Sequence, residues 1–272
     1  APYLNEPFFL GRQVVYFIVW IATAWMMYRN SVKQDTSGDY KLTSKMEAAS
    51  APLMMVFALT STFAAFDLLM SLDPHWFSTI FGVYFFAGCF MSFLATLVIT
   101  SVFLQSTGRL KNAISSEHYH DVGKFMFAML VFWAYIAFSQ FMLIWYGNLP
   151  EETGWYLRRQ TGGWASLGIV MIFGHFFIPF LFLVSRHIKR RPALLALGAA
   201  WLLVMHWLDL YWLVLPEYDH ALTEIPFSVF DLTCLLGIGG LFVAAWARAL
   251  GSCSLIAEKD PRVMESLTFE NA

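Results

Sequence analysis

Long stretches of this chain contain no charged side chain, and this feature constrains the fold more than any other. Residues 76–106, for example, contain no Asp, Glu, Lys, Arg or His. An apolar run of about 18 or more residues is long enough to cross a bilayer as an α-helix. Charged residues make up only 13% of the 272 residues, about half the fraction found in ordinary soluble domains. The sequence therefore predicts an integral membrane protein.

Seven such stretches predict an all-α bundle of seven transmembrane helices. Lipid offers no partners for free backbone groups, and the runs exceed the roughly ten residues of a barrel strand. One membrane domain is expected over residues 1–272, with a tail at 251–272. We predict spans near residues 12–29, 48–70, 77–104, 122–146, 162–184, 193–215 and 228–249.

The basic residues divide unequally between the two sides of this bundle. Only Arg12, Arg158 and Arg159 lie on the side of the N-terminus, and the other 14 of the 17 Lys and Arg lie on the opposite side. The positive-inside rule makes that opposite side, with the C-terminal tail, cytoplasmic. The outer face is acidic and carries Glu6, Asp73, Glu151, Glu152, Glu217, Asp219 and Glu224. Because Ala1 lies outside, we expect an odd number of preceding spans or a cleaved signal.

Ionisable side chains inside the spans are few, and such groups are expensive in lipid unless they have a task. His206 and Asp209 stand at i and i+3 in "VMHWLDLYW", on one helix face. Asp67 and Asp231 should lie near the outer depth of Asp209. A carboxylate beside an imidazole suits proton relay, so these residues outline a polar channel from the acidic face.

Each of these residues also has a purely structural interpretation. A lone membrane histidine such as His175 often only bonds a neighbouring helix. Asp67 could cap or pair near the interface, and His206 and Asp209 could pair for stability alone. Asp73 precedes Pro74, which is typical of an N-cap, here for the third span.

Four classes of seven-helix protein can be compared with these residues. A retinal protein needs a lysine in its last span, and residues 228–249 contain none. His175 and His206 could hold one haem b. A transporter and a quinone-associated subunit of a respiratory complex fit better and are not separated. The three cysteines form no CxxC or CxxCH motif, so iron–sulfur clusters and c-type haem are not expected in this chain.

Several long segments resemble one known family. They are "YLNEPFFLGR", "FDLLMSLDPHWFSTIFGVYFFAG", "HYHDVGKFMFA", "YIAFSQFMLIWYGNLPEET" and "HWLDLYW". The chain is similar over essentially its whole length to the ActF family, the second quinone-type membrane subunit of bacterial alternative complex III. This resemblance implies an NrfD-like (polysulfide-reductase-like) architecture of four-helix bundles, with about ten helices in the full-length protein.

The resemblance also implies a function and a set of partners. The chain would be an accessory membrane subunit of a quinol:electron-acceptor oxidoreductase in the bacterial inner membrane, most readily one that conducts protons. A second quinone-binding subunit and a structural scaffold are the alternatives. Menaquinone or ubiquinone could bind. The expected partners are lipids, a sister quinol-binding membrane subunit, multihaem and monohaem cytochrome c subunits, an iron–sulfur subunit and small membrane subunits, without nucleic acid.

Within that function, the polar residues are assigned to two halves of a proton path. The outer half-channel is expected to contain Asp67, Asp73, His75, His206, Asp209 and Asp231. The inner portion is expected to contain His175, Gln140 and Tyr135.

Overall fold

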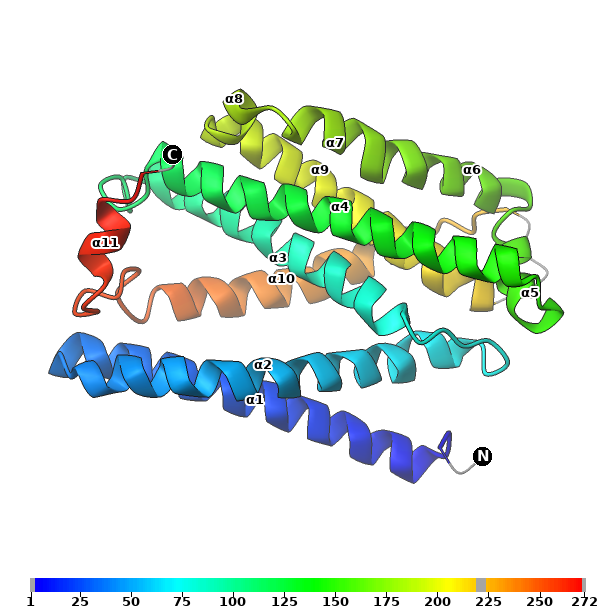
Figure 1. Ribbon diagram of the computed structural model, residues 1–272, viewed down its shortest axis with the longest axis horizontal. Coiled ribbons are helices and arrows are strands. Elements are labelled where there is room, and N and C mark those ends of the chain that lie inside the picture. Colours follow the sequence, from blue (N-terminus) through cyan, green and yellow to red (C-terminus); the bar gives the residue numbers. More distant parts are fainter. Residues whose placement is uncertain (1–2, 219–223, 271–272) are drawn as a thin grey trace.

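The computed structural model describes residues 3–218 and 224–270, and this part of the chain is helical with no strand (Figure 1). Asp219, one of the acidic residues expected on the outer face, lies outside the described residues. Seven helical segments are long and apolar enough to cross a membrane, as predicted. They are α1 (Glu6–Ser37), α2 with the 3-10 turn η1 (Tyr40–Leu72), α3 (Phe81–Ser106), α4 (Ser116–Gly147), α6 to α7 (Gly162–Leu183), α9 (Pro192–Tyr218) and α10 (Val229–Leu250).

Short elements join the long helices at the two ends of the molecule. α5 (Pro150–Arg158) follows α4, and α8 (Arg186–Lys189) precedes α9. The π-helix η2 (Met171–Phe177) separates α6 (Gly162–Val170) from α7 (Ile178–Leu183). α11 (Val263–Leu267) lies near the C-terminus, at the end of the molecule opposite α5 (Figure 1). We call these two ends the α5 end and the α11 end.

Several helices extend beyond the apolar runs that predicted them. α1 begins after Asn5, whose side chain accepts a hydrogen bond from the Phe8 amide, and stops at Gly38 in the left-handed conformation. α4 begins after Ser115, which forms a capping box. A hydropathy pattern marks only the lipid-facing length, whereas capping residues decide where the helix ends.

The third span begins later than predicted, and Asp73 does not cap it. α3 starts at Phe81 after Ile80, which makes no side-chain cap. Asp73 instead accepts a hydrogen bond from the backbone amide of His75 at 3.1 Å and pairs with Arg158. Asp73 therefore bonds within the turn around Pro74 and to Arg158, and it is not the N-cap of α3.

The core lies between α3, α4, α9 and the segment formed by α6, η2 and α7, which together make a four-helix bundle (Figure 1). Close approaches in it depend on glycine: a Cβ on Gly88 would lie 2.4 Å from His206 Cε1. α1 packs mainly on α2, and α2 on α3. No residue of α10 is buried, so this helix stands at the margin of the described structure.

Candidate functional site

Asp209, on α9, is the centre of a polar cluster inside the four-helix bundle. It is 1% exposed. The Tyr84 hydroxyl on α3 donates a hydrogen bond to Oδ1, and Trp133 Nε1 on α4 donates to Oδ2 at 3.2 Å. Three helices thus converge on one carboxylate, and these two donors are neutral groups.

His206 lies one turn before Asp209 on the same helix, as the i, i+3 spacing predicted. Its Nδ1 is 3.8 Å from Asp209 Oδ2, which is a close contact but longer than a hydrogen bond. The imidazole packs against the backbone of α3 at Gly88. This glycine is what allows the ring to stay beside the carboxylate.

His175 completes this central cluster from the π-helix η2. Its side chain is completely buried, and its ring lies 3.9 Å from the Trp133 ring and 6.4 Å from the His206 ring, measured between centroids. The structure therefore brings together Asp209, His206 and His175, which the sequence had assigned to two separate halves of a path.

The π-helix that carries His175 has a local cause in the sequence. The Ile178 amide donates to the Phe173 carbonyl, five residues back. In the same register the Gly174 carbonyl would require the amide of Pro179, which proline lacks. Trp201 Nε1 on α9 donates to that carbonyl instead, at 2.7 Å. A proline inside a helix usually produces a kink. Here a π-helix forms before Pro179, and a tryptophan from the neighbouring helix stabilises it.

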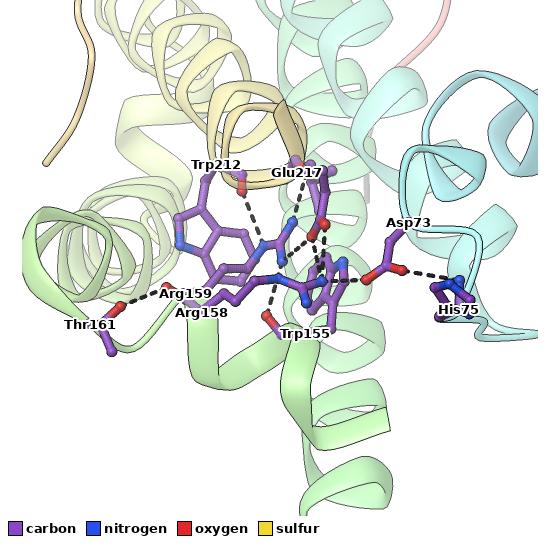
Figure 2. Close-up of polar contacts among 9 residues, drawn as sticks. Asp73, His75, Trp155, Arg158, Arg159, Thr161, Trp212 and Glu217 are labelled. Atoms are coloured by element: carbon purple, nitrogen blue, oxygen red, sulfur yellow. Dashed lines mark hydrogen bonds and ion pairs between the residues drawn. The ribbon is translucent and has the colours of Figure 1, made fainter. Parts of the chain in front are cut away.

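A second polar cluster lies at the α5 end of the bundle and joins three segments (Figure 2). Arg158 bridges Asp73 and Glu217, and Arg159 Nη1 pairs with Glu217 at 2.8 Å. The side chains of Arg159 and Glu217 are 0% and 2% exposed. This cluster ties the turn after α2 to α5 and to the end of α9.

Arg159 also stabilises the last turn of α9. Pro216 cannot donate to the Trp212 carbonyl four residues before it, and Arg159 Nε donates to that carbonyl at 3.2 Å. A second bond from Arg159 reaches the Leu213 carbonyl at 2.8 Å. The guanidinium stacks 3.3 Å above the Trp155 ring (Figure 2). Burial lowers the pKa of Arg159 to about 10, so it remains a cation at neutral pH.

Gln140, expected in the inner portion of a path, lies at the α5 end, beside connections that the sequence analysis placed on the outer side. Its Oε1 accepts from the Ser78 hydroxyl at 3.0 Å, and its Nε2 donates to the Tyr156 hydroxyl at 3.1 Å. Ser78 precedes α3 and Tyr156 is on α5, so Gln140 fastens both connections to α4. Tyr135 is 63% exposed on α4 and is not part of either cluster.

Asp67 is separate from both clusters. It forms a two-bond ion pair with Arg12, at 2.7 and 2.9 Å, and accepts a hydrogen bond from Tyr16 at 2.8 Å. These partners are all on α1, which with α2 runs beside the four-helix bundle (Figure 1). A structural ion pair, which was one of the interpretations of Asp67 from the sequence, accounts for all of these contacts.

The remaining two predicted residues lie elsewhere at the surface. His75 is exposed, and its backbone amide bonds Asp73. Asp231 belongs to the capping box of α10, where it accepts from the Ser228 amide at 2.8 Å, and it is 3.4 Å from the Tyr211 hydroxyl. The six residues expected in one outer half-channel therefore occupy several separate places.

Sequence reasoning missed the residues that organise both clusters. Tyr84 and Trp133 had no distinguishing pattern among 11 tyrosines and 11 tryptophans. A usable signal existed for Arg158 and Arg159, because they are adjacent cations on a side that carries only one other. Among the described residues, no group of three or more His, Cys, Asp and Glu is placed to hold a metal ion. Comparison with protein-family models and with curated proteins finds no match to this chain.

Proposed function

We propose that this chain is a proton-conducting membrane subunit of a quinol:electron-acceptor oxidoreductase of the alternative complex III type. The observation that carries proton conduction is the central cluster, a buried carboxylate with two histidines inside a membrane bundle. Buried ionisable groups within membrane helices typically mark ion or proton pathways. The type of complex rests on the sequence segments that resemble the ActF family, and on the apolar helices that suit a bacterial inner membrane.

The chemistry assigned to the central cluster is proton transfer between side chains. Asp209 would hold a proton or a negative charge, with Tyr84 and Trp133 stabilising the charged form through their hydrogen bonds. His206 Nδ1 lies 3.8 Å from Asp209 Oδ2 and would accept the proton once the two side chains move slightly closer. His175 would accept the proton next. The core of the bundle shields these groups from bulk water, which keeps the proton on them.

The cluster at the α5 end would form the outer mouth of this path. Glu217 follows Asp209 by eight residues on α9, which corresponds to about 12 Å along the helix. The intervening space contains Leu213 and packed aromatic rings of the core. The two clusters are thus separate hydrogen-bond networks, and protons would pass between them only when this layer moves or becomes hydrated.

A quinone site in this chain is the less supported alternative. A groove between α1 and α2 is walled by Tyr3, Phe8, Val15, Leu59 and Phe63, with Arg12 and Tyr16 beside them. The polar groups there are already paired: Arg12 and Tyr16 bind Asp67, and Thr60 bonds Trp20 and its own helix. Because these polar groups are already bonded to protein, the residues of this groove fit a quinone headgroup poorly. We assign no part of the proton path to a quinone in this chain.

A haem between His175 and His206 fits no better. Trp133, Met171 and Met205 pack into the core around these rings, where a porphyrin would need space. We therefore place the quinol-binding sister subunit, the cytochrome c subunits, the iron–sulfur subunit and the small membrane subunits outside this chain, as partners. The many exposed apolar side chains of α1, α2 and α10 provide surface for them and for lipid.

Asp209→Asn in the intact complex tests the proposal. Asparagine keeps the shape and can still accept the bond from Tyr84, so we expect assembly and quinol oxidation to persist while the number of protons moved per electron falls. The measurement is proton release from reconstituted vesicles. Asp121→Asn is the matched control, because Asp121 is a half-exposed partner of Lys124 and should leave the stoichiometry unchanged.

Two results would contradict the proposal. An unchanged proton-to-electron ratio in Asp209→Asn would remove the conduction role and favour a scaffold. Purification of the tagged chain from membranes without c-type haem absorbance would remove the assignment to this kind of complex.

A further inference from the structure

His175 and His206 are neighbours in the core, and three of their ring nitrogens are buried without a protein partner among the described residues. Within the described part of the chain, neither ring nitrogen of His175 has a hydrogen-bond partner, and nor has His206 Nδ1. His175 is 0% exposed. Leaving such a buried polar atom unsatisfied costs roughly 1–3 kcal/mol, and native proteins satisfy almost all of them.

The neighbouring side chains do not supply the missing bonds. Asp209 Oδ2 is 3.8 Å from His206 Nδ1 and already accepts from Trp133. Trp133 covers a face of the His175 ring, whereas imidazole nitrogens form hydrogen bonds in the plane of the ring. A small group between the two rings could bond a nitrogen of each.

The two rings are close enough to share one water molecule. Water bonds nitrogen at about 2.7–3.2 Å, so two nitrogens that share a water lie at most roughly 5–6 Å apart. The ring centroids of His175 and His206 are 6.4 Å apart, and atoms on the facing edges of two rings lie closer together than the centroids do. A neutral imidazole has one donor and one acceptor nitrogen, and water can serve either, so no particular tautomer is required.

We propose that a water molecule lies between His175 and His206 and forms a hydrogen bond with a nitrogen of each ring. Buried waters usually make two to four hydrogen bonds to polar groups that would otherwise be unsatisfied. Asp209 is near enough to His206 to polarise this water. A metal cation is a poorer occupant, since the described residues contain no three-ligand group for one.

This water would be the link that carries a proton to His175. Protonated His206 gives its Nδ1 proton to the water while the water gives one of its own protons to a His175 nitrogen. His206 becomes neutral, His175 becomes cationic, and the water is restored. This role rests on the proposed function, whereas the position of the water can be tested without it.

A density map of the intact complex, sharp enough to locate waters, tests the site directly. We expect a peak within hydrogen-bond distance of one nitrogen on each ring in the wild type. The peak should vanish in His175→Phe and persist in Met171→Leu, which alters an apolar neighbour in the same core cluster. Absence of the peak in the wild type, or a peak that bonds only one ring, would overturn the inference even if neither variant folds.

Infrared spectra of the wild-type complex in H₂¹⁸O give a second measurement. An isotope-sensitive O–H band that His175→Phe removes and Met171→Leu retains would support the site, and no such band in the wild type would contradict it. The two proposals fail in different ways. A water peak with unchanged stoichiometry in Asp209→Asn refutes proton conduction alone, and a lowered stoichiometry without the peak refutes the water alone.

Discussion

Asp209 and Glu217 are buried carboxylates on the same helix, but different kinds of donor hold them. Asp209 accepts hydrogen bonds from a phenol and an indole. Glu217 accepts from two guanidinium groups, Arg158 and Arg159. Arginine stays protonated in proteins, so Glu217 faces two permanent positive charges, whereas these two donors to Asp209 carry no charge.

Asp67 belongs with Glu217 in this comparison, because Arg12 holds it through two bonds. The sequence predicted Asp67 near the depth of Asp209 and Glu217 on the outer face. The structure groups them differently, because arginine holds Asp67 and Glu217 whereas neutral donors hold Asp209. From this division we expect the two arginine-held carboxylates to matter for stability and Asp209 to matter for proton transfer.

Removing Arg159 should have the largest effect on stability. Arg159→Met leaves Glu217 with one counter-charge fewer and frees the carbonyls of Trp212 and Leu213. Breaking a buried ion pair in this way costs about 3–5 kcal/mol. Denaturant unfolding in detergent should show the loss, while Arg262→Met, which removes an exposed pair with Glu47, should not. Equal unfolding curves would mean that the α5 cluster does not hold the bundle together.

Asp67→Asn should lower stability without changing proton transfer. The variant removes the counter-charge of Arg12 from a part-buried site, and we expect a loss of roughly 1–3 kcal/mol. The assembled complex should keep its proton-to-electron ratio, unlike Asp209→Asn. A reduced ratio with normal stability would place Asp67 on the proton path and break the division.

Gly88→Ala should disturb the central cluster without altering any polar group. The new Cβ would lie 2.4 Å from His206 Cε1, so the ring must move, at a cost of about 1–3 kcal/mol for overpacking. We expect slower proton transfer in vesicles. Gly237→Ala on α10, with no atom near its Cβ, is the control. Normal transfer in Gly88→Ala would show that the position of His206 is not critical.

The smallest effect is expected at His75. Its backbone amide, rather than its ring, donates the hydrogen bond to Asp73, and the residue is exposed. His75→Gln should therefore leave proton stoichiometry and unfolding unchanged. A loss of stoichiometry would restore His75 to the outer mouth.

Helix number and type could be predicted from the sequence because long charge-free runs and lipid leave few alternatives. The i, i+3 pair of His206 and Asp209 could also be predicted, since helix geometry alone sets its spacing. Contacts between distant segments could not be predicted from the sequence. The bond from Tyr84 to Asp209 and the pairing of Arg159 with Glu217 depend on how helices rotate against each other. One chain carries no pattern for that rotation.

Depth along a helix predicted poorly which residues lie together, because it does not show which helices are neighbours. Asp67 and Asp209 were expected near one depth, yet α1 surrounds the first and the four-helix bundle surrounds the second. Gln140 shows a related error, because its partners come from connecting segments whose paths the span pattern does not describe.

The π-helix in the fifth span has a consequence for the length of the chain. A π-turn accommodates one more residue than an α-turn between the same two ends. Deleting one residue from Met171–Phe177 would give a continuous α-helix of nearly the same reach, in which α6 and α7 keep the faces that they now present. The extra residue therefore changes only the side-chain directions within the π segment, where His175 lies inside the core.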